Sequence, residues 1–223
     1  MQSSRCVLLF TKPARPGRVK TRLIGELSAA EAASLHQAFL DDLMTRLLDG
    51  NFELKIAWAL DQGQAMPAGS GPGLVQEGAD LGERLYRGLR SEAAEYDNVM
   101  AIGSDHPELS LDRVEEGFER LESGDDVVIG PADDGGYYLI GVSSQVLDRA
   151  IFEGITWSSP EVLSSTLERC EALALRVSLL AVGTDVDTAD DLARLAANLA
   201  GDHESCPRTR ELLARWGRLE GLS

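Results

Sequence analysis

Positively charged residues are concentrated in one short stretch near the N-terminus. Residues 11–22, TKPARPGRVKTR, include no acid and five cationic side chains: Lys12, Arg15, Arg18, Lys20 and Arg22. The whole chain has 21 Lys and Arg against 37 Asp and Glu, which gives a formal net charge of −16. Cations gathered in so acidic a chain predict a cradle for an anion, and the alternative is a solvated loop that offsets nearby acids.

Acidic residues gather in three later motifs. The motifs are 103–107 (GSDHP), 130–137 (GPADDGGY) and 185–188 (DVDT). One or two carboxylates are a typical protein contribution to a Mg²⁺ site, because Mg²⁺ keeps waters and takes other ligands from substrate phosphates. Each motif also has a purely structural interpretation, which is an Asx turn at Asp105, an Asp-Gly hairpin at Asp134 and a helix cap at Thr188.

The glycines of the second motif and the histidines need separate interpretation. Gly135 and Gly136 would let a ligand approach the backbone closely, and Tyr137 follows them, so we expect substrate to bind there. His106 precedes a proline and is interpreted as a turn residue rather than a base. His36 falls on the apolar stripe of an expected helix and is interpreted as core-lining.

The elements that must position these residues alternate along the chain. Apolar runs predict strands at 6–10, 52–60, 74–76, 99–103, 127–130, 137–142 and 175–182. Helical spacing and capping signals predict helices at 28–50, 81–96, 110–121, 159–173 and 188–199, and a short terminal helix from Pro207. This alternation predicts an α/β fold with a mainly parallel sheet, whose carboxyl edge would carry the basic loop and the acidic motifs.

Length and composition limit the class of protein. We expect residues 1–200 to form one domain and residues 201–223 a helical appendage. The cysteines Cys6, Cys170 and Cys206 form no CxxC pair, and no apolar run is long enough to span a membrane, so we expect a cytoplasmic protein. The acidic balance argues against a nucleic-acid partner. The absence of GxSxG, GxGxxG and GxxxxGK[ST] disfavours a serine hydrolase, a Rossmann dehydrogenase and a P-loop kinase.

Taken together, the motifs resemble a known superfamily. The segment 12–23, the two motifs at Asp105 and Asp133, and the motif 185–192 are similar to the bacterial glycosyltransferase-A-like branch of the nucleotide-diphospho-sugar transferases. This branch is related to the phospholactate and molybdenum-cofactor guanylyltransferases, and the resemblance covers roughly Cys6 to Ala200. It implies a three-layer α/β/α sandwich with a mixed, mostly parallel sheet.

The resemblance also implies roles for individual residues. Asp105 corresponds to the principal Mg²⁺ (or Mn²⁺) ligand and Asp187 to the second. The acceptor or sugar region falls at residues 133–137. The nucleotide and phosphate loop would use Lys12, Arg15, Arg18, Lys20, Thr21 and Arg22. The expected catalytic residues are Lys20, Asp105, Asp133 and Asp134.

The motifs point to a reaction class less directly than to a fold. The chain lacks the glycine-repeat loop of pyrophosphorylases, and it has no D-x-D motif at the central strand, where Asp105 stands alone. We expect a Mg²⁺-dependent transferase that takes a nucleotide or nucleotide-sugar and a small-molecule acceptor. A glycosyltransferase-like activity is the preferred class. A nucleotidyltransferase that releases pyrophosphate and a non-catalytic nucleotide-binding module are the alternatives. A homodimer is left open.

Overall fold

The computed structural model describes residues 4–67, 71–202 and 204–219, and these residues form a seven-stranded sheet. The strands follow one another in the spatial order β3-β2-β1-β4-β6-β5-β7, and β6 alone runs antiparallel to its neighbours. Their bounds are β1 Arg5–Thr11, β2 Glu53–Trp58, β3 Gly73–Val75, β4 Asn98–Gly103, β5 Val127–Pro131, β6 Tyr137–Ser143 and β7 Val177–Leu179. The predicted mixed, mostly parallel sheet is therefore confirmed.

Six α-helices and two 3-10 turns complete the described fold. Their bounds are η1 Thr21–Leu23, α1 Ala29–Leu47, α2 Leu81–Glu92, α3 Leu111–Glu122, η2 Arg149–Ile151, α4 Val162–Ala172, α5 Ala189–Gly201 and α6 Pro207–Arg215. Ser28 and Thr188 both form the predicted capping boxes. The predicted start of α4 at Ser159 is wrong, since Ser158 has a φ of 63° and the helix begins only after Glu161. None of the described helices is long and apolar enough to cross a membrane.

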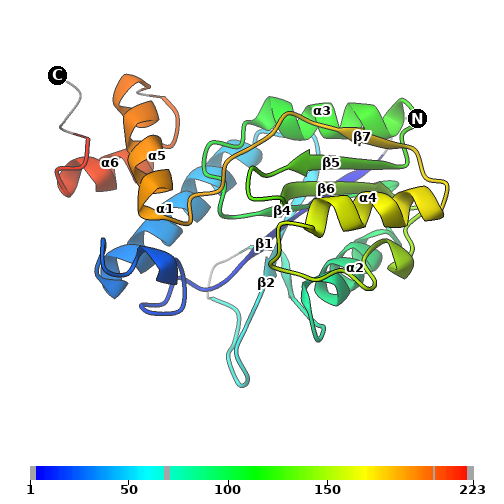
Figure 1. Cartoon of the computed structure of the whole chain (residues 1–223), viewed down its shortest axis with the longest axis horizontal. Coiled ribbons are helices and arrows are strands. Elements are labelled where there is room, and N and C mark those ends of the chain that lie inside the picture. The colour runs from blue at the N-terminus through cyan, green and yellow to red at the C-terminus, as the bar shows by residue number, and fades with distance from the viewer. Residues whose placement is uncertain (1–3, 68–70, 203, 220–223) are drawn as a thin grey trace.

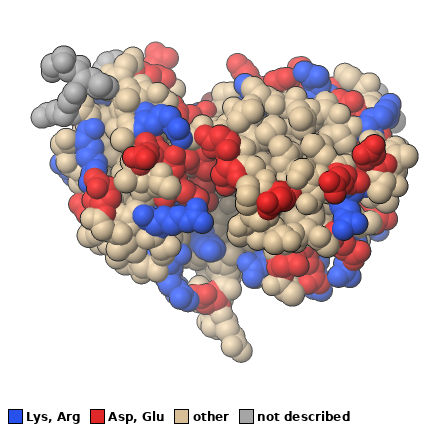
Figure 2. Space-filling view, viewed as in Figure 1, with Lys and Arg blue, Asp and Glu red and all other residues tan. Residues whose placement is uncertain are grey.

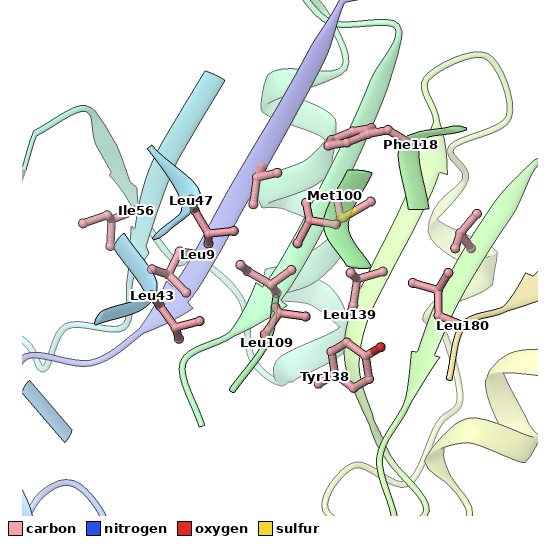
Figure 3. Packing of buried hydrophobic residues seen from close by; sticks show 14 of the residues in the cluster. Leu9, Leu43, Leu47, Ile56, Met100, Leu109, Phe118, Tyr138, Leu139 and Leu180 are labelled. Carbon is pink, nitrogen blue, oxygen red and sulfur yellow. The ribbon is translucent and has the colours of Figure 1, made fainter. Parts of the chain in front are cut away.

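The helices cover both faces of the sheet, as Figure 1 shows. On one face, Leu43 of α1 and Phe118 of α3 pack with Leu9 and Met100 from the central strands in a fully buried core (Figure 3). On the other face, α2, η2 and α4 bury Leu89, Ile151 and Cys170 against the sheet. The molecule is thus a three-layer sandwich in which β1 and β4 lie at the centre.

A third core lies on the side of α1 that faces away from the sheet. There Leu35 and Phe39 of α1 pack against Leu195 of α5 and Leu213 of α6. The buried carboxylate of Asp42 accepts hydrogen bonds of 2.9 Å from the backbone N–H groups of both Arg208 and Thr209. A carboxylate at a helix N-terminus satisfies otherwise unpaired donors and complements the helix dipole. The described residues of the expected appendage are therefore fastened to α1.

The second acidic motif is the connection of a hairpin. Strands β5 and β6 are adjacent and antiparallel, with Pro131 opposite Tyr137, and residues 132–136 join them. Ala132 and Gly136 are hydrogen-bonded across the turn. The structural interpretation of this motif, an Asp-Gly hairpin, is therefore the arrangement found in the structure.

Candidate functional site

The basic loop and the first acidic motif leave the sheet side by side. Strands β1 and β4 are parallel neighbours with Phe10 opposite Gly103, so Lys12 and Asp105 emerge at the same carboxyl edge. A cleft of about 590 Å³ opens there, lined by both segments and by Asp185 and Asp187 from the loop before α5. Figure 2 shows a hollow between the α1, α5 and α6 side and the sheet side, with cationic and acidic atoms facing each other across it.

Lys20 is the centre of this charged cluster. Its side chain is only 1% exposed, and its ammonium lies 2.5 Å from Oδ1 of Asp105 and 3.3 Å from Oδ1 of Asp187. It also donates a 2.7 Å hydrogen bond to the backbone carbonyl of Val186 and lies 5.4 Å from the centre of the Phe39 ring. Segments far apart in sequence therefore meet at one buried cation.

The carboxylates of the cluster have different electrostatic environments. Burial opposes the charged form of Asp105, but the charge and hydrogen bond of Lys20 outweigh it, so the pKa of Asp105 lies below its ordinary value. Burial, reinforced by the negative charge of Asp105, raises the pKa of Asp185 to about 7. The cluster holds more acid than Lys20 alone neutralises, which is the electrostatic condition for taking up a further cation.

Other cations line the rim of the cleft. Arg22 lies 3.6 Å from Asp187, and Arg18 forms a salt bridge with Asp61. Within the described residues, Lys12 and Arg84 form no salt bridge although both line the cleft. A smaller cavity of about 440 Å³ continues the cleft and is lined by Lys12, Arg15, Arg18, Thr21 and Arg84 among others. This end of the cleft has positive charge available for an anion.

A buried polar network supports the start of the basic loop. The Thr11 hydroxyl donates a 2.9 Å hydrogen bond to Ser104 Oγ, and it lies 3.2 Å from Nε2 of His36. The same nitrogen is 3.1 Å from the carbonyl oxygen of Lys12. Burial lowers the pKa of His36, so the neutral ring that can donate Nε2–H to Lys12 is favoured. His36 is buried as expected, but it fixes the backbone at the site rather than only filling the core.

Two further cleft residues were not singled out from the sequence. Gln76 follows β3, and its side-chain amide donates a 2.7 Å hydrogen bond to the carbonyl of Ala57. Arg84 lies in the first turn of α2. A signal in the sequence could have found both residues. Gln76 comes directly after the short strand and Arg84 follows the Asp80 helix cap, and both positions lie at the carboxyl edge of the sheet.

The residues of the second acidic motif mostly lie outside the cleft. Asp133 accepts a hydrogen bond from Thr184, and Asp134 accepts one from the backbone N–H of Gly136. Gly135 has a φ of +89° and lies close against the backbone of Pro160. Tyr137 does line the cleft, but its hydroxyl is buried, and burial raises the pKa of the phenol.

His106 has a structural environment. Its Nδ1 lies 2.6 Å from the carbonyl oxygen of Thr184, and its ring packs on Tyr138 with 4.9 Å between the ring centres. These contacts join the segment after β4 to the loop that carries Asp185 and Asp187. This arrangement matches the interpretation of His106 as a turn residue.

The donor set at Lys20 fits a magnesium ion that also uses substrate oxygens. Among the described residues, no three side chains of His, Cys, Asp or Glu are placed to hold a metal ion by themselves. Asp105 and Asp187 nevertheless converge on one positive charge, at 2.5 and 3.3 Å. Two carboxylates of this kind, completed by water and substrate phosphate, are a usual protein contribution to a Mg²⁺ site.

Solved structures share this fold. The chain is 32% identical to a protein from Desulfovibrio desulfuricans G20 that is provisionally described as a nucleotide-diphospho-sugar transferase, with a TM-score of 0.90 and coverage of 98% of this chain and 97% of that one. A cytidylyltransferase from Leptospira borgpetersenii has a TM-score of 0.61 at 10% identity, covering 100% and 98%. The 2-C-methyl-D-erythritol 4-phosphate cytidylyltransferase of Thermus thermophilus has a TM-score of 0.52 at 19% identity, covering 87% and 97%.

The two cytidylyltransferases share the fold, and the likeness at 32% identity places the chain in the nucleotide-diphospho-sugar transferase superfamily, which confirms the resemblance inferred from the motifs. Residues 33–159 match the family described as an uncharacterized protein conserved in bacteria (DUF2064), and the chain belongs to that family. A search of curated proteins finds no significant match.

Proposed function

We propose that the protein is a metal-dependent transferase that moves a sugar from a nucleotide-diphospho-sugar to a small-molecule acceptor. The observation that carries the proposal is the cleft in which Lys20, Asp105 and Asp187 meet beside the basic loop. The relative with 32% identity over nearly the whole chain is provisionally described as a nucleotide-diphospho-sugar transferase, which supports sugar transfer as the first candidate.

In this proposal the basic end of the cleft binds the diphosphate of the donor. Lys12 and Arg84 line the cleft without a carboxylate partner among the described residues, so they can bind phosphate without first breaking a salt bridge. Arg22 needs only to leave a 3.6 Å contact with Asp187 at the surface. Cations held in place around a leaving diphosphate stabilise the negative charge that develops on it.

Asp105 and Asp187 are the residues that would hold Mg²⁺ or Mn²⁺. When bound, the metal would neutralise charge on the diphosphate as the bond between the sugar and the phosphate breaks. The chain's own contribution is positional, because the Thr11, Ser104 and His36 network fixes the backbone just before Lys12 and Asp105. The acceptor oxygen would bond to the sugar carbon as the bond from that carbon to the diphosphate breaks, the hydroxyl proton would pass to water, and the nucleoside diphosphate would leave.

Nucleotidyl transfer is the second candidate, and the surplus of cations favours it. Six cationic side chains, Lys12, Arg15, Arg18, Lys20, Arg22 and Arg84, line the cleft and its smaller continuation, and a nucleoside triphosphate carries more negative charge than a nucleotide-sugar. In that reaction an acceptor oxygen would attack the α-phosphate, and pyrophosphate would leave. The two reactions differ in their products, so one assay separates them.

The test is product analysis with purified protein, Mg²⁺ and panels of nucleotide-sugars, nucleoside triphosphates and small acceptors. Release of a nucleoside diphosphate from a nucleotide-sugar supports sugar transfer, and release of pyrophosphate from a triphosphate supports nucleotidyl transfer. Asp105→Asn should lower either turnover by roughly 100-fold or more, since it removes a carboxylate that would hold the metal ion.

The matched control is Asp126→Asn. Asp126 also forms a salt bridge, with Arg176, but it lines a different cavity. This variant should keep full turnover. Full activity in folded Asp105→Asn protein, or no turnover and no binding with any donor in wild type, would contradict the proposal.

A further inference from the structure

The ammonium of Lys20 has no hydrogen-bonding capacity left for a phosphate. A lysine ammonium has three donors, and in this structure the three acceptors within 3.3 Å are Asp105, Asp187 and the carbonyl of Val186. The Phe39 ring lies on a further side, and the side chain is 1% exposed. Lys20 therefore differs from Lys12 and Arg84, which line the same cleft without a carboxylate partner among the described residues.

The oxygens that surround Lys20 are also those that would hold a divalent cation. Asp105 and Asp187 are bridged by Lys20, and both line the cleft. A metal ion on these oxygens would lie within a few ångströms of the ammonium. Like charges at such a distance repel strongly when they are partly shielded from water. Lys20 and the metal thus exclude each other from these carboxylates.

We propose that Lys20 is a resident counterion that must leave Asp105 and Asp187 before a divalent cation can bind, and that nucleotide phosphate is the partner it then takes. This inference rests on the proposed function. The four-carbon stem of lysine lets its ammonium turn without movement of the backbone. The exchange keeps the acidic pair partly neutralised in the resting protein and places a positive charge beside the phosphates when the metal binds.

The exchange makes the metal and the nucleotide bind cooperatively. Metal alone must displace Lys20 into water, and nucleotide alone finds Lys20 already paired. Together the two ligands supply a new partner for the carboxylates and for the ammonium. Such coupling is reciprocal, so the nucleotide should tighten metal binding by the same factor by which metal tightens nucleotide binding.

The first experiment measures Mn²⁺ binding without any nucleotide, by calorimetry and by electron paramagnetic resonance of free Mn²⁺. Lys20→Met keeps the unbranched stem, one atom shorter, and removes the charge, so it should bind Mn²⁺ at least about tenfold more tightly than wild type. Lys20→Gln, whose amide can still donate to one carboxylate, should give the same direction and serves if Lys20→Met does not fold.

Lys55→Met is the matched control, since Lys55 forms a 2.5 Å ion pair with Glu92 that lies outside the cleft. Its Mn²⁺ affinity should equal that of wild type. Unchanged or weaker Mn²⁺ binding in the folded Lys20 variants would overturn the inference, because it would mean that Lys20 and the metal do not compete.

The second experiment measures coupling with each of four nucleoside diphosphates: ADP, CDP, GDP and UDP. In wild type, Mn²⁺ and the diphosphate that binds should strengthen each other, and Lys20→Met should reduce that coupling factor several-fold. An equal factor in both proteins would overturn the inference. The outcome is separate from that of the proposed function, because tighter Mn²⁺ binding in Lys20→Met stands without turnover, and turnover can occur without any competition by Lys20.

Discussion

The turn that joins β5 and β6 gives a direct test of how Gly135 is used. Its φ of +89° lies in the region that favours glycine. A Cβ atom at this position would lie 2.8 Å from both the carbonyl carbon and the Cα of Pro160, and nearer still to the carbonyl oxygen. Gly135 also accepts a 2.9 Å hydrogen bond from Leu163 at the start of α4. The close backbone approach here is made by the protein itself.

Gly135→Ala should therefore be strongly destabilising. The left-handed backbone costs an alanine about 1–2 kcal/mol. Overpacking against backbone that cannot turn away costs about 1–3 kcal/mol more. The sum is roughly 2–5 kcal/mol, which for a chain of this size lowers the melting temperature by about 4–20 °C.

Gly63→Ala is the control, because Gly63 has a φ of +78° but nothing within 4 Å of the added Cβ. It should lose only the backbone component of about 1–2 kcal/mol. Thermal unfolding of both variants, followed by circular dichroism and calorimetry, measures the difference. Equal losses in the two variants would refute the packing of Gly135 on Pro160, and the turn would then be open for a ligand at that point.

Three further predictions concern polar side chains and their hydrogen bonds. Thr11→Val removes the hydroxyl that donates to Ser104 and should cost about 1–3 kcal/mol in chemical unfolding, whereas no loss would mean the network is not formed. Burial lowers the pKa of His36, so its contribution to stability is complete above about pH 6.5 and is lost as the pH falls below that value. His36→Gln should therefore flatten the dependence of the melting temperature on pH between pH 8 and 5.5. An unchanged slope would contradict this. A hydrogen bond from Arg5 lowers the pKa of Glu122, so Glu122→Gln should flatten the loss of stability below about pH 4.5, measured by acid titration.

Much of the fold follows from local patterns in the sequence. The capping boxes at Ser28 and Thr188 fix the starts of α1 and α5, because each pairs a hydroxyl and a carboxylate over a single turn. The apolar run before Asp105 predicts a central strand, and β4 is buried between two neighbours. The start of α4 could not be predicted in this way, since Ser158 has a positive φ and the first turn of α4 is bonded to the distant β5–β6 hairpin, where Leu163 donates to the carbonyl of Gly135.

The sequence predicted which segments meet at the site but not which side chains contact one another. Parallel strands end at one edge of a sheet, so Lys20, Asp105 and Asp187 could be expected near one another. The same reasoning placed Asp133 and Asp134 at the edge but could not give their direction. In the structure Asp134 turns back and satisfies the backbone N–H of Gly136 within the hairpin, and Asp133 accepts a hydrogen bond from the Thr184 hydroxyl.

The position of Lys20 between two carboxylates shows why the pattern of charges in the sequence could not predict the role of each cation. Lys20 has a left-handed backbone, with a φ of 46°, directly before η1, and this turn sends its side chain inward while Arg22 remains largely exposed. Two cations that the sequence places together in one phosphate loop therefore have different positions. The buried one is held by Asp105 and Asp187, whereas Arg22 is 72% exposed and so is available to an anion that enters the cleft. Lys20 becomes available only when something else satisfies Asp105 and Asp187, so the pairing of charges in the cleft argues for metal and nucleotide entering together.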